Sequence, residues 1–448
     1  MELSTIRANT PTLGTRLVAM GALLVAQATM AAPTCWTIGA GGNGHSYEAT
    51  YVPGGTTFDN AESGALGAGG YLATIHSTAE NNFCYNLVSD SQYWYQDSFN
   101  NGIGPWLGGW QPPPRTDEPA GGWAWKPTGE AWTYTNWGQD EPNNYDGIEH
   151  WLHFFGYRTL KAPTWNDLPN FQGPKGYVTE FEPGLSASNV NFGYVRVGTS
   201  ANGNLTVTNT DTHNTQLGGT IGPAPGASDF APQAGPLGFT LGSAESAYRT
   251  FTYTPGQRVP DSALVSITSN VGNVTRTLSG RGVGPVFDSR PVPGSTLDFG
   301  EVRVGEVAKQ ALIISNLTTD PNLDDLTDLT LLSTQIIGDS PDCFKLAGFT
   351  PGMVLAKSEL VTLAVEFHAH GPLGDKSAKL LIETDQNAPF GRPGDTFTFR
   401  LAGQAVPEPG SLALAMAAVF GAAGLLCRRR GCTARKRTGC AIPSQERD

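Results

Sequence analysis

Five oxygen-bearing side chains cluster along one turn and one later segment of the chain. Glu141 and Asn143 flank a proline, Glu149 follows shortly after, and Asn166 and Asp167 are adjacent. Calcium takes about six to eight oxygen ligands from carboxylates, amide carbonyls and water. We therefore predict that these five side chains hold one Ca²⁺ ion, and that open positions on the ion accept the hydroxyl groups of a sugar.

The first 32 residues have the layout of a secretory signal peptide. Arg7 and Arg16 come before an apolar stretch over 17–25, and the small residues Ala31 and Ala32 follow it. A basic region, an apolar core and small residues at a cleavage site define such signals. We expect residues 1–32 to direct export and the mature protein to start near residue 33.

A second targeting signal lies near the other end of the chain. Its elements are Val406, Pro407, Glu408 and Pro409, then an apolar run over 412–426, then arginines at 428–430. As a helix with a rise of ~1.5 Å per residue, this run reaches ~23 Å, short of a ~30 Å hydrocarbon core. We expect a short transmembrane helix that contacts the membrane at least transiently.

The Pro-Glu-Pro lead, the short apolar helix and the arginines together resemble the PEP-CTERM sorting signal of Gram-negative bacteria. The resemblance covers 406–430 and implies recognition, and removal of the anchor, by an exosortase-type enzyme. It implies export through the inner membrane to the cell surface or extracellular matrix. The family usually stops after its basic cluster, whereas a basic tail over 431–448 follows here. An ordinary single-pass anchor with a positive cytoplasmic end is the alternative.

The exported body is acidic. Residues 33–405 contain 19 basic and 36 acidic residues, a net charge of −17. Such a surface repels phosphate backbones, so we expect no nucleic-acid partner. Of the three cysteines in this body, Cys35 and Cys84 could form a disulfide in an oxidising compartment, which would leave Cys343 as a buried, unpaired thiol.

Two similar units follow a tryptophan-rich first piece. The motif over 190–198 (VNFGYVRVG) returns over 297–305 (LDFGEVRVG), and alternating apolar residues follow each copy. Period-2 alternation with frequent turn residues predicts antiparallel β-sandwiches over 186–284 and 294–405. The three-residue step from Phe192 to Val195 would reverse the facing, so we predict a bulge at 193–194 and at 300–301. Both units resemble choice-of-anchor D modules, relatives of the ASH and MSP immunoglobulin-like sandwiches, which implies a spacer or assembly role.

Residues 33–182 should form an α+β domain. Ser77 and Glu80 form a capping box that opens a helix to about residue 88, with Phe83, Leu87 and Cys84 on its core side. A weaker helix over 58–66 and a short strand over 71–75 precede it. From residue 106 onward the chain is turn-rich and aromatic, and we expect Trp106, Trp132, Trp137 and Trp165 to pack in the core.

The same domain resembles the C-type lectin-like family over its whole length. The landmarks are the segments Gly70–Ile75, Trp106–Gly109, Trp123–Trp125, Trp132–Trp137, Glu141–Asn143, Trp165–Asp167 and Gly176–Glu180. The resemblance implies a cis peptide bond before Pro142. It also implies that Glu141, Asn143, Glu149 and Asn166 each bind the ion and a sugar hydroxyl, as in mannose-type sites. Asn144 and His150 stand where an auxiliary ion would need acids, so a single ion is expected.

We find no pattern typical of an enzyme. The histidine pairs at 150 and 153 and at 368 and 370 lack a third ligand at a metalloenzyme spacing, and no nucleophile or phosphate-binding motif is present. Two functions remain open. One is a calcium-dependent carbohydrate binder at the cell surface, for exopolysaccharide or another glycan. The other is a structural or adhesive surface protein whose lectin-like fold contacts protein, or acts as a scaffold, without calcium.

Overall fold

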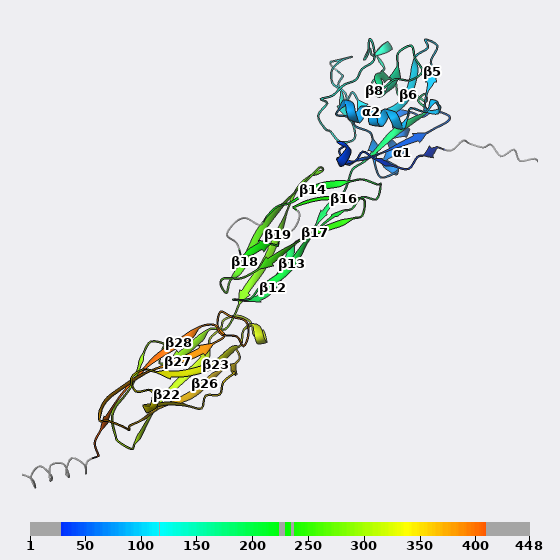
Figure 1. Ribbon diagram of the computed structural model, residues 1–448. Coiled ribbons are helices and arrows are strands. Elements are labelled where there is room, and N and C mark those ends of the chain that lie inside the picture. The colour runs from blue at the N-terminus through cyan, green and yellow to red at the C-terminus, as the bar shows by residue number, and fades with distance from the viewer. Residues whose placement is uncertain (1–27, 116, 224–228, 234–236, 409–448) are drawn as a thin grey trace, which may run out of the picture.

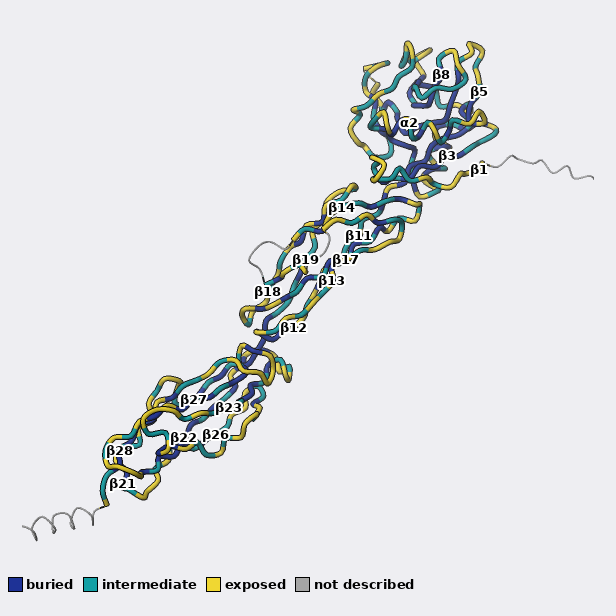
Figure 2. The backbone as a smooth tube through the Cα atoms, viewed as in Figure 1, coloured by how far each residue is buried: buried dark blue, intermediate teal, exposed yellow. Residues whose placement is uncertain are grey.

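Three globular units lie end to end in an elongated molecule (Figure 1). The structure, a computed structural model, describes residues 28–115, 117–223, 229–233 and 237–408. The expectation of a mostly β, multidomain chain with few helices is confirmed. Buried residues run along the interior of each unit (Figure 2). The predicted signal peptide up to residue 27, Pro409, the apolar run and the basic tail lie outside the described residues.

The first unit is one ten-stranded sheet with two helices. Its strands are β1 (Thr29–Met30), β2 (Thr34–Cys35), β3 (Ser46–Tyr51), β4 (Tyr71–Leu72), β5 (Tyr95–Gln96), β6 (Gly102–Trp110), β7 (Ala124–Trp125), β8 (Trp151–Gly156), β9 (Thr164–Leu168) and β10 (Gly176–Phe181). The main order is β1-β3-β10-β6-β8-β9, with the four short strands β2, β4, β5 and β7 attached to it. β6 and β10 pair in parallel and the other strands pair antiparallel. Long loops connect β6 to β7 and β7 to β8.

Both predicted helices form. α1 is Phe58–Gly67 and α2 is Thr78–Leu87. The Ser77 hydroxyl accepts from the backbone N–H of Glu80, which is the predicted N-cap, and Cys84 is fully buried on the core side of α2. The predicted strand over 71–75 is shorter, because β4 ends at Leu72.

Aromatic side chains fill much of this core. Trp106 and Trp165 are fully buried, as predicted, whereas Trp132 and Trp137 are half-buried and pack against the cluster from its edge. Trp165 contacts both of these rings and Trp125, at centroid distances of 5.9, 6.0 and 6.2 Å. The short 3₁₀ helices η1 (Ile38–Ala40), η2 (Ser91–Tyr93) and η3 (Tyr145–Gly147) lie in the connecting segments.

The second unit is a sandwich of a four-stranded and a five-stranded sheet. The first sheet has the order β11-β13-β17-β15 and the second β12-β19-β18-β14-β16. Their bounds are β11 (Leu185–Ala187), β12 (Val190–Arg196), β13 (Ala201–Asn209), β14 (Leu217–Ile221), β15 (Phe230–Pro232), β16 (Gly238–Leu241), β17 (Ser246–Tyr253), β18 (Pro260–Ser269) and β19 (Gly272–Val283).

The third unit repeats this topology, with sheets β20-β22-β26-β24 and β21-β28-β27-β23-β25. Its elements are β20 (Phe287–Arg290), β21 (Thr296–Arg303), β22 (Val307–Asn316), η4 (Asp324–Leu326), β23 (Leu329–Ile337), η5 (Pro341–Cys343), β24 (Phe344–Ala347), β25 (Met353–Leu355), β26 (Leu360–His368), β27 (Gly374–Thr384) and β28 (Thr396–Val406).

The predicted bulges are present in both sandwiches. The register shifts between Asn191 and Tyr194 and between Asp298 and Glu301, where Gly193 and Gly300 adopt φ values of 66° and 63°. Only glycine takes this left-handed conformation without cost. The sandwiches are not purely antiparallel, however, because β12 pairs in parallel with β19, and β21 with β28. In each unit the first strand (β11 or β20) lies at the edge of the four-stranded sheet, and the second (β12 or β21) lies at the edge of the five-stranded sheet.

Cys35 and Cys84 do not pair. All three cysteines within the described residues are free thiols. Cys84 lies on the core side of α2 and is fully buried, whereas the Cys35 thiol donates to the carbonyl of Gly44 at 3.8 Å. The possible disulfide is therefore wrong, and the buried, unpaired state expected for Cys343 is confirmed.

Candidate functional site

The loop that precedes β8 is fixed to β9 by one carboxylate. The Glu141–Pro142 peptide bond is cis, as the resemblance implied. Asp167, fully buried on β9, accepts the backbone N–H of Asn143 at 3.1 Å and of Asn144 at 2.9 Å. These two bonds hold the turn that carries Glu141 and Asn143 against the strand that carries Asp167.

Glu149 closes the same loop on itself. Its carboxylate accepts the backbone N–H of Tyr145 at 2.9 Å, and its own N–H donates to the Asn144 side-chain oxygen at 3.0 Å. Tyr145 and Ile148, which lie between Asn144 and Glu149 in the chain, are 66% and 54% exposed. The loop therefore presents two apolar side chains to solvent while it keeps Glu149 inside.

Three carboxyl groups of the predicted site share one electrostatic environment. Burial, then the charges of Asp167 and Glu149, raises the pKa of Glu141 to about 8. Burial, with the charge of Asp167, raises the pKa of Glu149 to about 7 although Tyr145 donates to it. Burial also raises the pKa of Asp167. Like charges brought together out of water disfavour ionisation, and a cation placed among them would reverse that.

Two acceptor atoms of the predicted site have no donor. The Oε2 atom of Glu141 and the Oδ1 atom of Asn166 are buried and make no hydrogen bond. A buried acceptor without a partner costs about 1–3 kcal/mol, so such atoms are rare in folded proteins. In the part of the chain that the structure describes, no three His, Cys, Asp or Glu side chains are arranged to hold a metal. Glu141, Glu149 and Asp167 of the predicted site are therefore not arranged as a three-acid metal site in this structure.

The sequence reasoning missed Glu118, which lies beside this cluster. It precedes Pro119 in a second cis Glu-Pro bond, and its carboxylate is 3.1 Å from the Nδ1 atom of His150. Neither its two oxygens nor that nitrogen makes a hydrogen bond. The Glu-Pro dipeptide also occurs at 182–183 and 408–409, so its recurrence would not have singled out Glu118. His153, in contrast, is fully buried and packs against Trp106.

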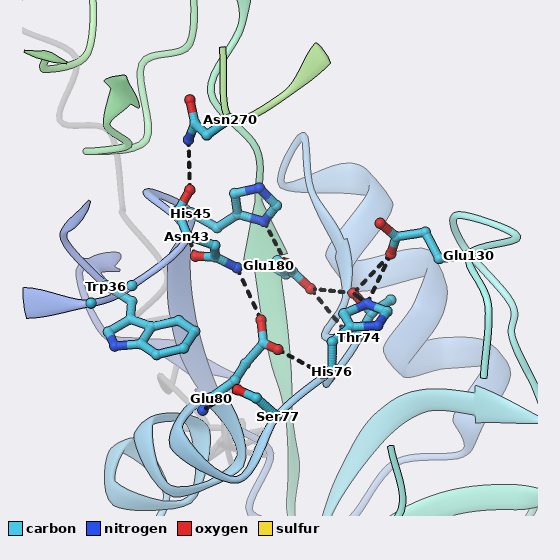
Figure 3. A pocket seen from close by; sticks show the side chains of 12 residues that line it. Trp36, Asn43, His45, Thr74, His76, Ser77, Glu80, Glu130, Glu180 and Asn270 are labelled. Atoms are coloured by element: carbon cyan, nitrogen blue, oxygen red, sulfur yellow. Dashed lines mark hydrogen bonds and ion pairs between the residues drawn. The ribbon is translucent and has the colours of Figure 1, made fainter. Parts of the chain in front are cut away.

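A separate cavity of about 360 Å³ lies between the first unit and the second (Figure 3). It contains buried carboxylates, but these already have donors. Glu180 accepts from His45 at 2.6 Å and from the N–H of Thr74 at 2.8 Å, and Glu80 accepts from the Tyr47 hydroxyl at 2.6 Å. Glu141, in contrast, is a predicted ligand with a buried oxygen that has no donor among the described residues. The cluster around Glu141 is therefore a better candidate for a cation site than this cavity.

The sorting motif begins where the last strand ends. Val406 is the last residue of β28, and Pro407 and Glu408 follow it. Among the described residues no helix is long and apolar enough to cross a membrane; the predicted transmembrane helix lies outside them.

Comparisons with known proteins locate one family and several partial likenesses. Residues 405–430 match the PEP-CTERM protein-sorting motif. No significant match to a curated protein is found.

The solved structures resemble parts of the chain. The C-type carbohydrate-recognition domain of cow CD23, solved in the presence of an oligosaccharide, is 20% identical over 31% of this chain and 88% of its own, with a TM-score of 0.23. The C-type lectin CEL-I from Cucumaria echinata is 20% identical over 31% and 89%, with a TM-score of 0.23. The ASH/PapD-like domain of human CEP192 is 13% identical over 22% and 84%, with a TM-score of 0.18. At these scores the likenesses carry no argument about function.

The sorting motif alone supports a statement about location. It implies exosortase-dependent sorting to the surface of a Gram-negative bacterium.

Proposed function

We propose that this surface-sorted chain is a binding protein rather than an enzyme, and that its first unit, a C-type lectin-like domain, binds carbohydrate through one calcium ion. The ligands are Glu141, Asn143, Glu149, Asn166 and Asp167. The first four of these also contact sugar hydroxyls, in the manner of a mannose-type site. The two sandwiches, which we propose are choice-of-anchor D-like modules, act as a spacer that carries this domain away from the membrane.

One observation supports the ion above the others: the Glu141 Oε2 and Asn166 Oδ1 atoms are buried without donors. A divalent cation would pair with both and would relieve the repulsion that raises the pKa of Glu141 and of Glu149. These residue types fit calcium, which prefers carboxylate and amide oxygens. When bound, the ion would supply positions at which vicinal hydroxyls replace water.

The two asparagines would make recognition of a sugar directional. An ionised carboxylate only accepts hydrogen bonds, whereas an amide both accepts and donates. Glu141 with Asn143, and Glu149 with Asn166, would each offer a hydroxyl one acceptor and one donor. The exposed Tyr145 ring on the same loop is placed to pack against the sugar or, in the alternative function, against a protein surface.

Calorimetric titration of calcium into the purified protein tests the ion. We expect one site with a dissociation constant on the order of 10⁻⁴–10⁻³ M, as for extracellular calcium modules. The double variant Glu149→Gln with Asp167→Asn should lose the calcium heat. Glu130→Gln, which removes a half-exposed carboxylate elsewhere in the same unit, should keep it.

A glycan array with and without EDTA then tests the sugar. Calcium binding together with an EDTA-sensitive glycan signal would establish the lectin function. Calcium binding without a glycan signal would leave a calcium-stabilised adhesive domain. Equal behaviour of the wild type and the double variant in both assays would refute the site and favour the scaffold or protein-binding alternative.

A further inference from the structure

In the part of the second unit that the structure describes, the outer surface of one sheet carries no charged side chain. It lies on β13 and β17, whose inward side chains Leu205, Val207 and Phe251 are fully buried. We call it the hydroxyl–amide face, and its members are the outward side chains Asn202, Asn204, Thr206, Thr208, Ser246, Tyr248, Thr250 and Thr252, with Gln233 beside them. In an exported body of net charge −17 such an uncharged sheet face is unusual.

Hydrogen bonds across this face fix the orientation of its amides. Thr252 donates through its hydroxyl to the Asn202 side-chain oxygen at 2.8 Å, and Gln233 donates to the same oxygen at 3.1 Å. Thr250 donates in the same way to the Asn204 oxygen at 2.8 Å. The acceptor side of each asparagine is therefore used within the sheet. Among the described residues nothing bonds to either Nδ2 group, so both donors are free for a ligand.

These donors form a regular row. Asn202 and Asn204 are two residues apart on one strand, about 6.8 Å, and the next strand lies about 4.8 Å away. Tyr248 stands beside them on β17, 66% exposed, opposite Thr206. The face therefore combines oriented amide donors, threonine hydroxyls and one exposed aromatic ring on a sheet surface.

The second repeat shows that the sandwich fold does not require this chemistry. The pair Asn202 and Thr252 corresponds to Lys309 and Glu366, which are also opposite each other and form an ion pair at 2.7 Å. The pair Asn204 and Thr250 corresponds to two alanines, Ala311 and Ala364. The same backbone positions thus accept a charge pair or no polar group at all, so neither hydrogen-bonded pair is needed to hold the sheet together.

We propose that the hydroxyl–amide face binds a strand of neutral polysaccharide, independently of calcium. Free amide donors suit the many hydroxyl oxygens of such a polymer, and an exposed tyrosine can pack against the apolar face of a sugar ring. Because this face carries no charged group, an uncharged polymer could bind without displacing water from an ion. An acidic polymer would instead be repelled by the net negative body. This surface is separate from the calcium cluster in sequence and in unit, so each site can fail without the other.

Co-sedimentation of the purified protein with insoluble neutral polysaccharides, namely cellulose, a β-1,3-glucan and mannan, tests this in EDTA. EDTA silences the calcium cluster and leaves this face intact. We expect retention on at least one polymer, and loss of at least about tenfold in affinity for the double variant Asn202→Asp with Asn204→Asp. Aspartate keeps the oxygen that accepts from each threonine, but it replaces the amide donor by a negative charge, so the added charge needs the separate control below.

Two further variants complete the test. Tyr248→Ala should weaken retention on the same polymer. Ala311→Asp places a carboxylate on the equivalent face of the third unit, opposite Ala364, and should leave retention unchanged. The proposal is overturned if no neutral polysaccharide retains the protein in EDTA, or if the double variant binds as well as the wild type. Preference for an acidic polymer, or a face that instead joins two copies of the chain, as ultracentrifugation would show, would overturn it equally.

Discussion

Arg196 of the second unit binds several groups of the third unit, and its replacement by methionine should weaken the junction between the two units. The guanidinium is almost fully buried and lies 3.0 Å from the carboxylate of Asp385, which has no exposure. It also donates to four main-chain carbonyls of the third unit, those of Asp325, Asp328, Asp385 and Ala388, at 2.7 to 3.1 Å. Removal of one partner from a buried ion pair costs about 3–5 kcal/mol, because the other charge stays buried.

The ion-pair contribution should lie toward the lower end of that range. Asp385 keeps two other donors, the backbone N–H groups of Thr330 at 2.8 Å and of Gly391 at 2.9 Å. The four carbonyls that lose their donor add about 1 kcal/mol each where water cannot reach them, so the ion-pair value is a minimum. We therefore expect Arg196→Met to destabilise the junction by at least roughly 3 kcal/mol, and the double variant with Asp385→Asn to lose less than the sum of the two single changes.

Differential scanning calorimetry with small-angle X-ray scattering measures this. The variant should melt earlier, and its scattering should show a less extended average shape than the wild type. Arg303→Met is the matched control, because Arg303 occupies the same position in the second repeat, is 55% exposed and, among the described residues, forms an ion pair only with Glu306, at 3.9 Å. Exposed pairs contribute about 0–1 kcal/mol. If Arg196→Met and Arg303→Met shift the melting profile equally, the reasoning about this junction is refuted.

Three further predictions follow from buried polar groups. The pKa of Glu141 is raised from 4.5 to about 8 and that of Glu149 from 4.5 to about 7, so between these values the folded protein holds more protons than the unfolded chain. Without calcium, Tm should therefore fall as the pH rises from about 5 to 8, and millimolar calcium should oppose that fall. A Tm that does not change with pH would contradict the clustering of these carboxyl groups. Burial by itself would lower the pKa of His45, but its bond to Glu180 raises it above 6.5; this pair therefore stabilises the fold fully below pH 6.5 and less as pH rises through the raised value, and His45→Gln should remove that part of the pH dependence of Tm. Asn316→Ala removes the side chain that accepts from the Val286 N–H and donates to the buried carbonyls of Thr327 and Leu355. Urea unfolding should show that the free energy of unfolding falls by at least about 2 kcal/mol, and a fall below about 0.5 kcal/mol would contradict the importance of these bonds.

Local patterns predicted the elements that depend on neighbours in sequence. Ser77 and Glu80 define the start of α2, because an N-cap bond joins residues only three apart. The bulges were equally predictable, since Gly193 and Gly300 occupy the same step of a repeated motif. The cis bond before Pro142 was implied by the family resemblance, and the structure contains it.

Long-range pairings were harder to predict. The crossover that makes β12 and β21 parallel partners depends on which sheet each strand joins, and strand alternation does not encode that choice. The predicted disulfide between Cys35 and Cys84 was wrong for the same reason, because the number of residues between two cysteines does not determine their distance in the folded chain. Glu118 reaches the candidate site through folding of the long loop between β6 and β7, and no local pattern in the sequence pointed there.

The two copies of the Val-Arg-Val-Gly motif separate what sequence determined from what tertiary structure decided. The sequence by itself determined the repeat, the strand, the bulge and the sorting motif, because each depends on residues close together in the chain. It could not distinguish Arg196 from Arg303, whose flanking residues are the same. One is buried in a junction and the other lies in solvent because a third unit packs against the end of the second, and among the described residues no further unit packs against the end of the third. Burial and pairing of a charge are properties of what surrounds it in space, so only the folded, assembled chain decides them.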